Sequence, residues 1–232
     1  MERSRGPIIS LDGLGSSGKS SVGAAVAAQL GCRFFDTGLL YRALTWLALE
    51  RGLDPSAGAA IAPLVGEIDL DADEAGRLAR VIVEGRDVAG EIRTPRVDRA
   101  VSAVSRQPEV RAALLGRQRA IASRGGIVVA GRDIGVAVLP DADVKVWLDA
   151  SAEERAARRA SERGIDPASP AGLAILDDLR RRDAADGSRA VSPARAADDA
   201  VHVRTDRNTF EETVAAVLAV VRAALARQEA HQ

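Results

Sequence analysis

The chain has 232 residues, of which 47% are hydrophobic, and its 33 acidic and 32 basic side chains leave a formal net charge of −1. This length suits one α/β unit with insertions, and the balanced charge gives no indication of nucleic-acid binding. No apolar run approaches the ~18 residues of a membrane span. The single cysteine, Cys32, excludes an internal disulfide and suits the reducing cytoplasm.

The first predicted elements are a buried strand, a glycine-rich turn and a helix. They lie in residues 8–21, I-I-S-L-D-G-L-G-S-S-G-K-S-S, and the helix continues to Leu30. The turn fits the phosphate-loop pattern G-x4-G-K-S/T, whose backbone N–H groups surround phosphate oxygens while its lysine adds a full charge and its hydroxyl coordinates Mg²⁺. Ser20 is the expected metal ligand. A nucleoside triphosphate is expected at Gly13, Leu14, Gly15, Ser16, Ser17, Gly18, Lys19, Ser20 and Ser21.

The middle of the chain predicts helices interrupted by a small antiparallel hairpin. In the hairpin, two alternating apolar and polar runs are separated by turn residues, which is the pattern of paired half-buried strands. The predicted elements are a strand at 33–36, a helix to Glu50, a loop with a short helix at 52–63, the hairpin at 67–88, and a helical stretch at 94–124 that is broken near Pro108.

The last hundred residues return to strands alternating with helices. Two arginine-rich helices flank a Gly- and Pro-rich loop at 164–170, the arrangement of a mobile lid. The predicted elements are strands at 127–130 and 144–148, a helix capped by Ser151, a helix from Gly172 to about Asp186, a strand at 200–204 and a helix at 209–227.

This alternation predicts an α/β fold in which a parallel sheet is flanked by helices on both faces. Ligands of such sheets bind beyond the carboxyl ends of the strands. Polar residues that follow the predicted strands should therefore share one rim, and these are Asp12, Asp36, Thr37, Gly131–Asp133 and Asp149.

Several further segments resemble bacterial cytidylate kinases, which are nucleoside monophosphate kinases with a phosphate loop. The segments are D-T-G-L-L-Y-R (36–42), V-A-G-E-I-R-T (88–94), V-R-A-A-L-L-G-R-Q-R (110–119), G-R-D-I-G (131–135) and R-D-A-A-D-G-S-R (182–189). The resemblance covers nearly the whole chain in order. It implies one domain over 1–232, with a monophosphate-binding region at 38–125 that contains the β insert at about 67–88, and a helical lid at 155–189.

The resemblance also implies the reaction and the roles of particular residues. The family transfers the γ-phosphoryl group of ATP to CMP or dCMP with Mg²⁺. For this chain we separately expect a cytoplasmic location, a monomeric state and no nucleic-acid or membrane partner. Lys19, Arg132 and Arg42 would act on the transferred group. The implied sites are Thr37, Arg111, Asp133 and Arg189 at the cytosine, Arg182, Asp186 and Ser102 at the ribose, Arg42 and Arg132 at the acceptor phosphate, and Arg155 and Arg159 at the triphosphate.

Two alternatives stay open at this stage. The acceptor could be UMP, AMP or a hydroxylated metabolite such as shikimate, for which Asp36 or Asp133 would serve as the base. A nucleotide-dependent regulatory switch is the non-enzymatic alternative, but the chain has no N-K-x-D guanine-reading motif and carries many arginines near the predicted rim.

Overall fold

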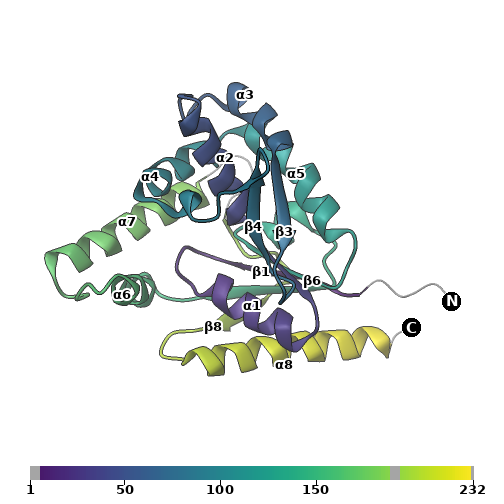
Figure 1. Ribbon diagram of the computed structural model, residues 1–232. Helices are drawn as coiled ribbons and strands as arrows, with labels where there is room; N and C mark the ends of the chain where they lie inside the picture. The colour runs from purple at the N-terminus through teal and green to yellow at the C-terminus, as the bar shows by residue number, and fades with distance from the viewer. Residues whose placement is uncertain (1–5, 189–193, 231–232) are drawn as a thin grey trace.

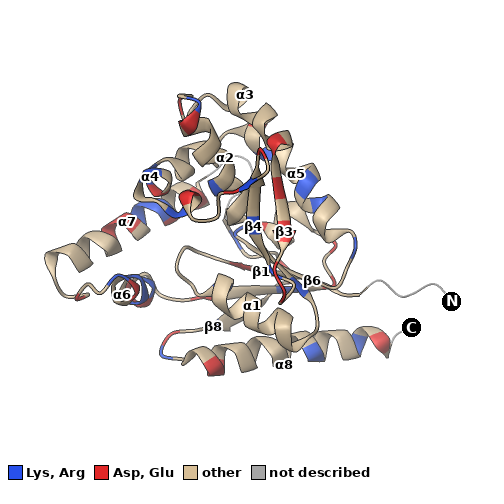
Figure 2. Cartoon of the chain, in the orientation of Figure 1, with Lys and Arg blue, Asp and Glu red and all other residues tan. Residues whose placement is uncertain are grey.

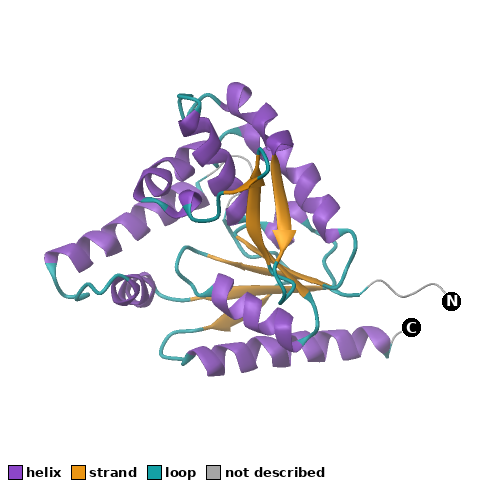
Figure 3. Cartoon of the chain, viewed as in Figure 1, coloured by secondary structure: helices purple, strands orange, loops and turns teal. Residues whose placement is uncertain are grey.

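The computed structural model describes residues 6–188 and 194–230, and a parallel five-stranded sheet lies at its centre (Figures 1 and 3). Each strand pairs with its neighbour in parallel register, which confirms the predicted sheet. The strands, in spatial order, are β2 (Arg33–Asp36), β6 (Ile127–Gly131), β1 (Ile8–Gly13), β7 (Val144–Asp149) and β8 (Val201–Arg204).

Helices cover both faces of this sheet because successive strand residues point to opposite sides. Ile9 and Leu11 of β1 face a core that they share with α1 (Lys19–Gln29) and α8 (Phe210–Glu229). Ile8 faces the second core. That core includes residues of α2 (Gly38–Glu50), α3 (Gly58–Ile61), α4 (Pro95–Val104), α5 (Pro108–Ala122) and the 3-10 helices Ala62–Glu67 and Glu91–Arg93.

The predicted hairpin is present as a three-stranded antiparallel sheet. It consists of β3 (Ile68–Ala72), β4 (Leu78–Val83) and a two-residue third strand, β5 (Arg86–Asp87), which the sequence pattern did not indicate. Ile68, Val81 and Val83 bury one face of this sheet in the second core. Its turn reaches the edge of β2, where the Phe34 amide donates to the Gly76 carbonyl at 3.1 Å.

Two helices form a hairpin that projects from the sheet (Figure 1, left). They are α6 (Ala152–Glu162) and α7 (Pro170–Gly187). Ala160 of α6 and Leu179 of α7 belong to a small apolar core between them. Helix α7 begins two residues before the predicted start, because Ser169 caps it and Pro170 takes the first helical position. None of the described helices is long and apolar enough to cross a membrane.

Candidate active site

A cavity of about 930 Å³ opens at the carboxyl ends of the sheet strands. The predicted rim is confirmed for Asp36, Thr37 and Gly131–Asp133, which line this cavity, whereas Asp12 and Asp149 do not line it. The cavity is lined by many of the residues expected from the sequence: Gly15, Ser16, Ser17, Gly18, Lys19, Ser20, Ser21, Thr37, Arg42, Ser102, Arg111, Arg132, Asp133, Arg159 and Arg182. Arg189 lies outside the described residues.

The phosphate loop joins β1 to the first turn of α1. Gly18 precedes the helix with a left-handed φ of 87°, a conformation that favours glycine. The Lys19 ammonium donates to the Leu14 carbonyl at 2.9 Å, so the lysine folds back over its own loop. Burial and the neighbouring Arg132 lower the pKa of Lys19 to about 8. The loop therefore presents a desolvated cation beside backbone donors, which suits a phosphate group.

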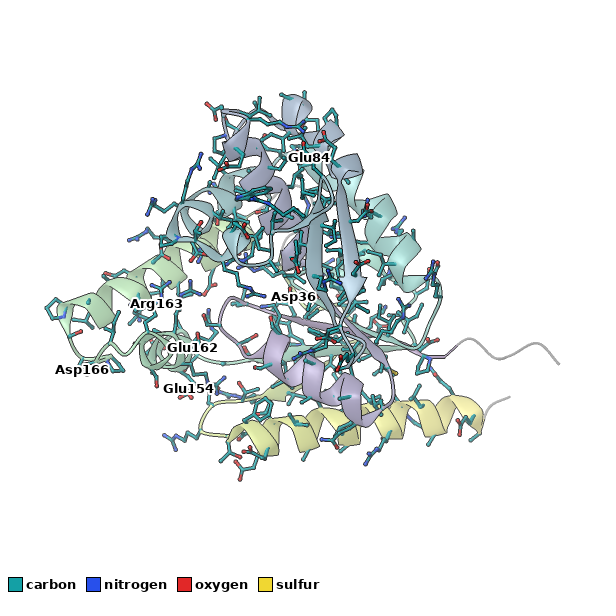
Figure 4. All side chains as sticks on the ribbon, viewed as in Figure 1. Asp36, Glu84, Glu154, Glu162, Arg163 and Asp166 are labelled. Carbon is teal, nitrogen blue, oxygen red and sulfur yellow. The ribbon has the colours of Figure 1, made fainter. Side chains whose placement is uncertain are left out.

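Ser20 and Asp36 join the phosphate loop to the end of β2. The Ser20 hydroxyl donates to Asp36 Oδ2 at 2.6 Å, while Asp36 Oδ1 accepts the Gly38 amide at 2.9 Å. Figure 4 labels Asp36 near the middle of the molecule. In the described part of the chain, no group of three or more His, Cys, Asp or Glu side chains could hold a metal alone. A hydroxyl beside a carboxylate fits Mg²⁺ that takes its other ligands from phosphate and water.

A buried ion pair forms another wall of the cavity. Arg111 of α5 and Asp133, which follows β6, are each 9% exposed and their side chains contact one another. Arg111 also donates to the Ser105 carbonyl at 3.3 Å and lies 5.8 Å from the centre of the Tyr41 ring. The Thr37 hydroxyl donates to the Ala130 carbonyl at 2.9 Å. This wall presents a fixed carboxylate and guanidinium side by side, an arrangement that can recognise a polar ring.

Two arginines from separate elements, Arg42 and Arg132, also line the cavity. Arg42 of α2 donates to the Ile92 carbonyl at 3.2 Å and to Asp98 of α4 at 2.7 Å. Arg132, directly before Asp133, pairs with Asp186 of α7, whose side chain is 3% exposed. Asp186 therefore contacts Arg132 and does not itself line the cavity. The concentration of cations suits two phosphate groups held close together.

The helical hairpin brings two arginines to the phosphate loop (Figure 2 shows its charged residues). Arg159 lines the cavity, and its guanidinium lies 3.5 Å from the Ser16 hydroxyl; burial and the neighbouring Arg163 lower its pKa. Arg155 does not line the cavity. Its side chain is 3% exposed. It donates to the carbonyls of Gly15 and Ala150 at 3.1 and 3.0 Å and to the Asp183 carboxylate at 2.6 Å. Its contact with Gly15 fastens the hairpin to the loop.

Two residues of this region were missed by the sequence interpretation. Arg93 lines the cavity, and it lies in the segment V-A-G-E-I-R-T, so that segment was the available signal. Asp12 was placed at the rim without a role. Its buried carboxylate accepts the amides of Ile134 and Gly135, each at 2.8 Å. No sequence pattern links Asp12 to those amides, because 122 and 123 residues separate them.

Comparison with known proteins gives one consistent result. The family model described as cytidylate kinase matches residues 9–223. A cytidylate kinase of Streptomyces avermitilis is 45% identical over 217 residues, which cover 92% of each chain. A bifunctional pantoate ligase/cytidylate kinase of Synechococcus sp. strain CC9902 is 41% identical over 97% of this chain but only 47% of its own length, so the chain spans about half of that relative.

The likeness to solved structures concerns the fold. A gluconokinase from Sinorhizobium meliloti covers the whole chain with a TM-score of 0.50 and 18% sequence identity. At that identity the match supports the architecture of the sheet and its helices and carries no information on the acceptor.

Proposed function

The chain belongs to the cytidylate kinase family, and from that membership we propose that it transfers the γ-phosphoryl group of ATP to CMP and dCMP, giving CDP or dCDP and ADP. The observation that carries the choice of acceptor is the buried Arg111–Asp133 pair in the wall of the cavity that the phosphate loop also lines. We also propose 38–125 as the monophosphate-binding region and 155–189 as the lid. A monomeric state, a cytoplasmic location and the absence of nucleic-acid partners stay predictions.

The donor side of the reaction is assigned to the phosphate loop. Its backbone amides and Lys19 bind the β- and γ-phosphates and stabilise the charge that builds up during transfer. Bound Mg²⁺ would supply further neutralising charge to the ATP phosphates, and Ser20, oriented by Asp36, would be its protein ligand. Arg155 holds the hairpin against Gly15, while Arg159 reaches the loop from α6 and adds positive charge beside it.

The acceptor side needs positioning rather than a base. A phosphate oxygen of CMP is already anionic at neutral pH, so it attacks the γ-phosphorus directly while the bond to the ADP oxygen breaks and its electron pair leaves with ADP. Arg42 and Arg132 would clamp the acceptor phosphate, with Arg93 beside them. Ser102 and Arg182 are assigned to the ribose, whereas Asp186, which was expected there too, would act through its contact with Arg132. Asp98 and the Ile92 carbonyl hold Arg42 in place for this role.

The cytosine is assigned to the buried pair. The Asp133 carboxylate would accept a hydrogen bond from the exocyclic amine of the base, and Arg111 would donate to the ring acceptors. Thr37 and Arg189 are assigned to the same base. Uracil presents a carbonyl oxygen where cytosine presents its amine, so the carboxylate would face another acceptor. A site that leaves buried polar groups unpaired rejects the wrong ligand strongly.

A hydroxylated metabolite is the less favoured acceptor. Its hydroxyl would need a carboxylate base, and Asp36 and Asp133 were the candidates. Asp36 is already hydrogen-bonded to Ser20 and Gly38, and Asp133 is paired with Arg111. Both carboxylates are therefore held by other groups of the protein, which favours a nucleotide over a hydroxylated metabolite as the acceptor.

Exchanging Asp133 for asparagine is expected to narrow the preference for CMP over UMP. The amide keeps the size of the side chain and offers a donor to the uracil carbonyl. Steady-state kcat/KM for each nucleotide, measured with ATP across an Mg²⁺ titration, gives the ratio for wild type and variant. An equal loss of rate with both nucleotides and a shifted Mg²⁺ requirement would instead assign Asp133 to base or metal chemistry.

ATP binding is expected to take up protons near pH 8. At that pH Lys19 is about half protonated, and the bound phosphate anions favour its charged form, so roughly half a proton should enter per site. The affinity for ATP should therefore fall as the pH rises above 8, because Lys19 then loses its charge. Calorimetric titrations in two buffers with different ionisation enthalpies measure the uptake. Lys19→Met should abolish it, and an unchanged uptake in that variant would assign the proton to another group.

A further inference from the structure

We propose that Asp12 is a positioning residue, whose buried carboxylate fixes the segment that carries Arg132 and Asp133 against the strand that carries the phosphate loop. The inference rests on the proposed function, since it concerns how the ATP and CMP halves of one site are held in a common frame. Asp12 lies directly before Gly13 of the loop, and in the sheet it stands opposite Gly131 of β6.

The contacts of Asp12 are specific to this segment. Its two oxygens accept the successive amides of Ile134 and Gly135, each at 2.8 Å, and the residue is 4% exposed. These amides belong to the short π-helix Ile134–Val138, which begins immediately after Asp133. Hydrogen bonds to a carboxylate are stronger than those between neutral groups, and a buried amide without an acceptor is costly. Asp12 therefore fixes where the chain goes after it leaves β6.

Close packing at Gly135 supports the same conclusion. A Cβ atom on Gly135 would lie 2.9 Å from the Ser10 hydroxyl oxygen, 3.2 Å from Lys145 Cδ and 3.4 Å from Asp12 Oδ2. The segment therefore packs closely against side chains of β1 and against Lys145 of β7, and the Ser10 hydroxyl is the nearest obstacle to a methyl group. Ser10 contributes only packing in this place, because its buried hydroxyl has no hydrogen-bond partner within the described residues.

The placement of the segment matters because consecutive residues face different parts of the reaction. Arg132 pairs with Asp186 and is assigned to the acceptor phosphate, while Asp133 pairs with Arg111 and is assigned to the base. A shift of the chain after β6 would move both side chains relative to the phosphate loop. In-line transfer between two bound phosphates is sensitive to displacements of about 1 Å.

The test compares Asp12→Asn with Ser10→Ala, a neighbour on the same strand and the same side. An asparagine oxygen can accept one amide, but its NH₂ group meets the other donor, so the segment must shift. We expect kcat/KM for CMP to fall at least tenfold at pH 8, where the Asp12 carboxyl, with a pKa raised by burial to about 7, is ionised. The KM for ATP should change less than threefold, and Ser10→Ala should behave as wild type.

A second pair of variants approaches the contact from the other side. Gly135→Ala should also lower kcat/KM for CMP, and adding Ser10→Ala should restore part of that loss, because it removes the atom nearest to the new methyl group. This pair keeps the proposal testable even where Asp12→Asn does not fold. Equal losses toward ATP and CMP, normal kinetics in Asp12→Asn, or no recovery in the Gly135 double variant would each overturn the proposal.

A measurement without substrate separates this inference from the proposed function. Hydrogen exchange of the Ile134 and Gly135 amides should accelerate at least tenfold in Asp12→Asn and remain as in wild type in Ser10→Ala. This outcome would support the contact whatever acceptor the enzyme uses, whereas wild-type protein that leaves CMP unphosphorylated would contradict only the function. Unchanged exchange in Asp12→Asn would overturn the positioning role.

Discussion

Replacing Lys19 with methionine is expected to lower kcat by a hundredfold or more. The ammonium is assigned to the group in transfer, and removing a charge that acts mainly in the transition state costs about 3 kcal/mol or more. Methionine keeps the length of the side chain without its charge. The change should also leave the fold intact, because the ammonium donates to the Leu14 carbonyl within its own loop. Initial rates with CMP and ATP measure the effect.

The matched control for that variant is Lys145→Met, since Lys145 is the other lysine of the chain. Lys145 lies in β7 and pairs with Asp199 at 2.8 Å, outside the lining of the cavity. The Lys145→Met variant should retain near-normal turnover. Thermal melting of both variants checks that neither result reflects unfolding. Comparable activity in the two variants would contradict the role of the phosphate loop.

The second large effect is expected from Arg132→Ala. This change removes a guanidinium assigned to the acceptor phosphate and also removes one partner of the buried Asp186. We therefore expect the KM for CMP to rise and kcat to fall, with kcat/KM about a hundredfold lower, because the reacting phosphate loses both binding and orientation. Steady-state kinetics with varied CMP at saturating ATP separate the two parameters.

Two further variants assign the cause of that loss. In Arg132→Ala/Asp186→Ala the buried carboxylate is also absent, so stability lost with the Arg132–Asp186 contact should return in part while turnover stays low. Arg180→Ala removes an exposed lid arginine that pairs with Glu153 and should leave both parameters unchanged. Recovery of CMP turnover in the double variant would show that Arg132 serves only to neutralise Asp186.

The sequence was sufficient to predict the features that depend on local pattern. Apolar runs ending in polar residues predicted the parallel strands and the shared rim, and both are present. The start of α7 was predicted two residues late because the cap at Ser169 and the proline after it were interpreted as loop. The short strand β5 was missed because two charged residues, Arg86 and Asp87, carry no strand pattern.

The parts of the site that the sequence did not predict depend on contacts between distant segments. The amides of Ile134 and Gly135 meet Asp12 only after β1 and β6 have paired, so no spacing along the chain reveals that contact. The same applies to Arg155. Its position on the lid suggested direct contact with triphosphate, whereas its guanidinium is buried against Gly15 and Asp183 once α6 packs on α7.

The most direct test of the account is a competition among acceptors in one reaction. Wild-type protein, ATP and Mg²⁺ are mixed with equal concentrations of CMP, UMP, AMP and shikimate, and the products are followed by ³¹P NMR or chromatography. The initial rates of CDP, UDP and shikimate phosphate formation and of AMP consumption then stand in the ratio of kcat/KM. AMP is followed by its loss because ADP is also the co-product of every turnover. The account predicts that CDP forms first, with each other product at least tenfold slower. Uracil lacks the amine that Asp133 would bind, adenine is a larger two-ring base, and shikimate lacks the acceptor phosphate assigned to Arg42 and Arg132. Preferential phosphorylation of UMP, AMP or shikimate would contradict it.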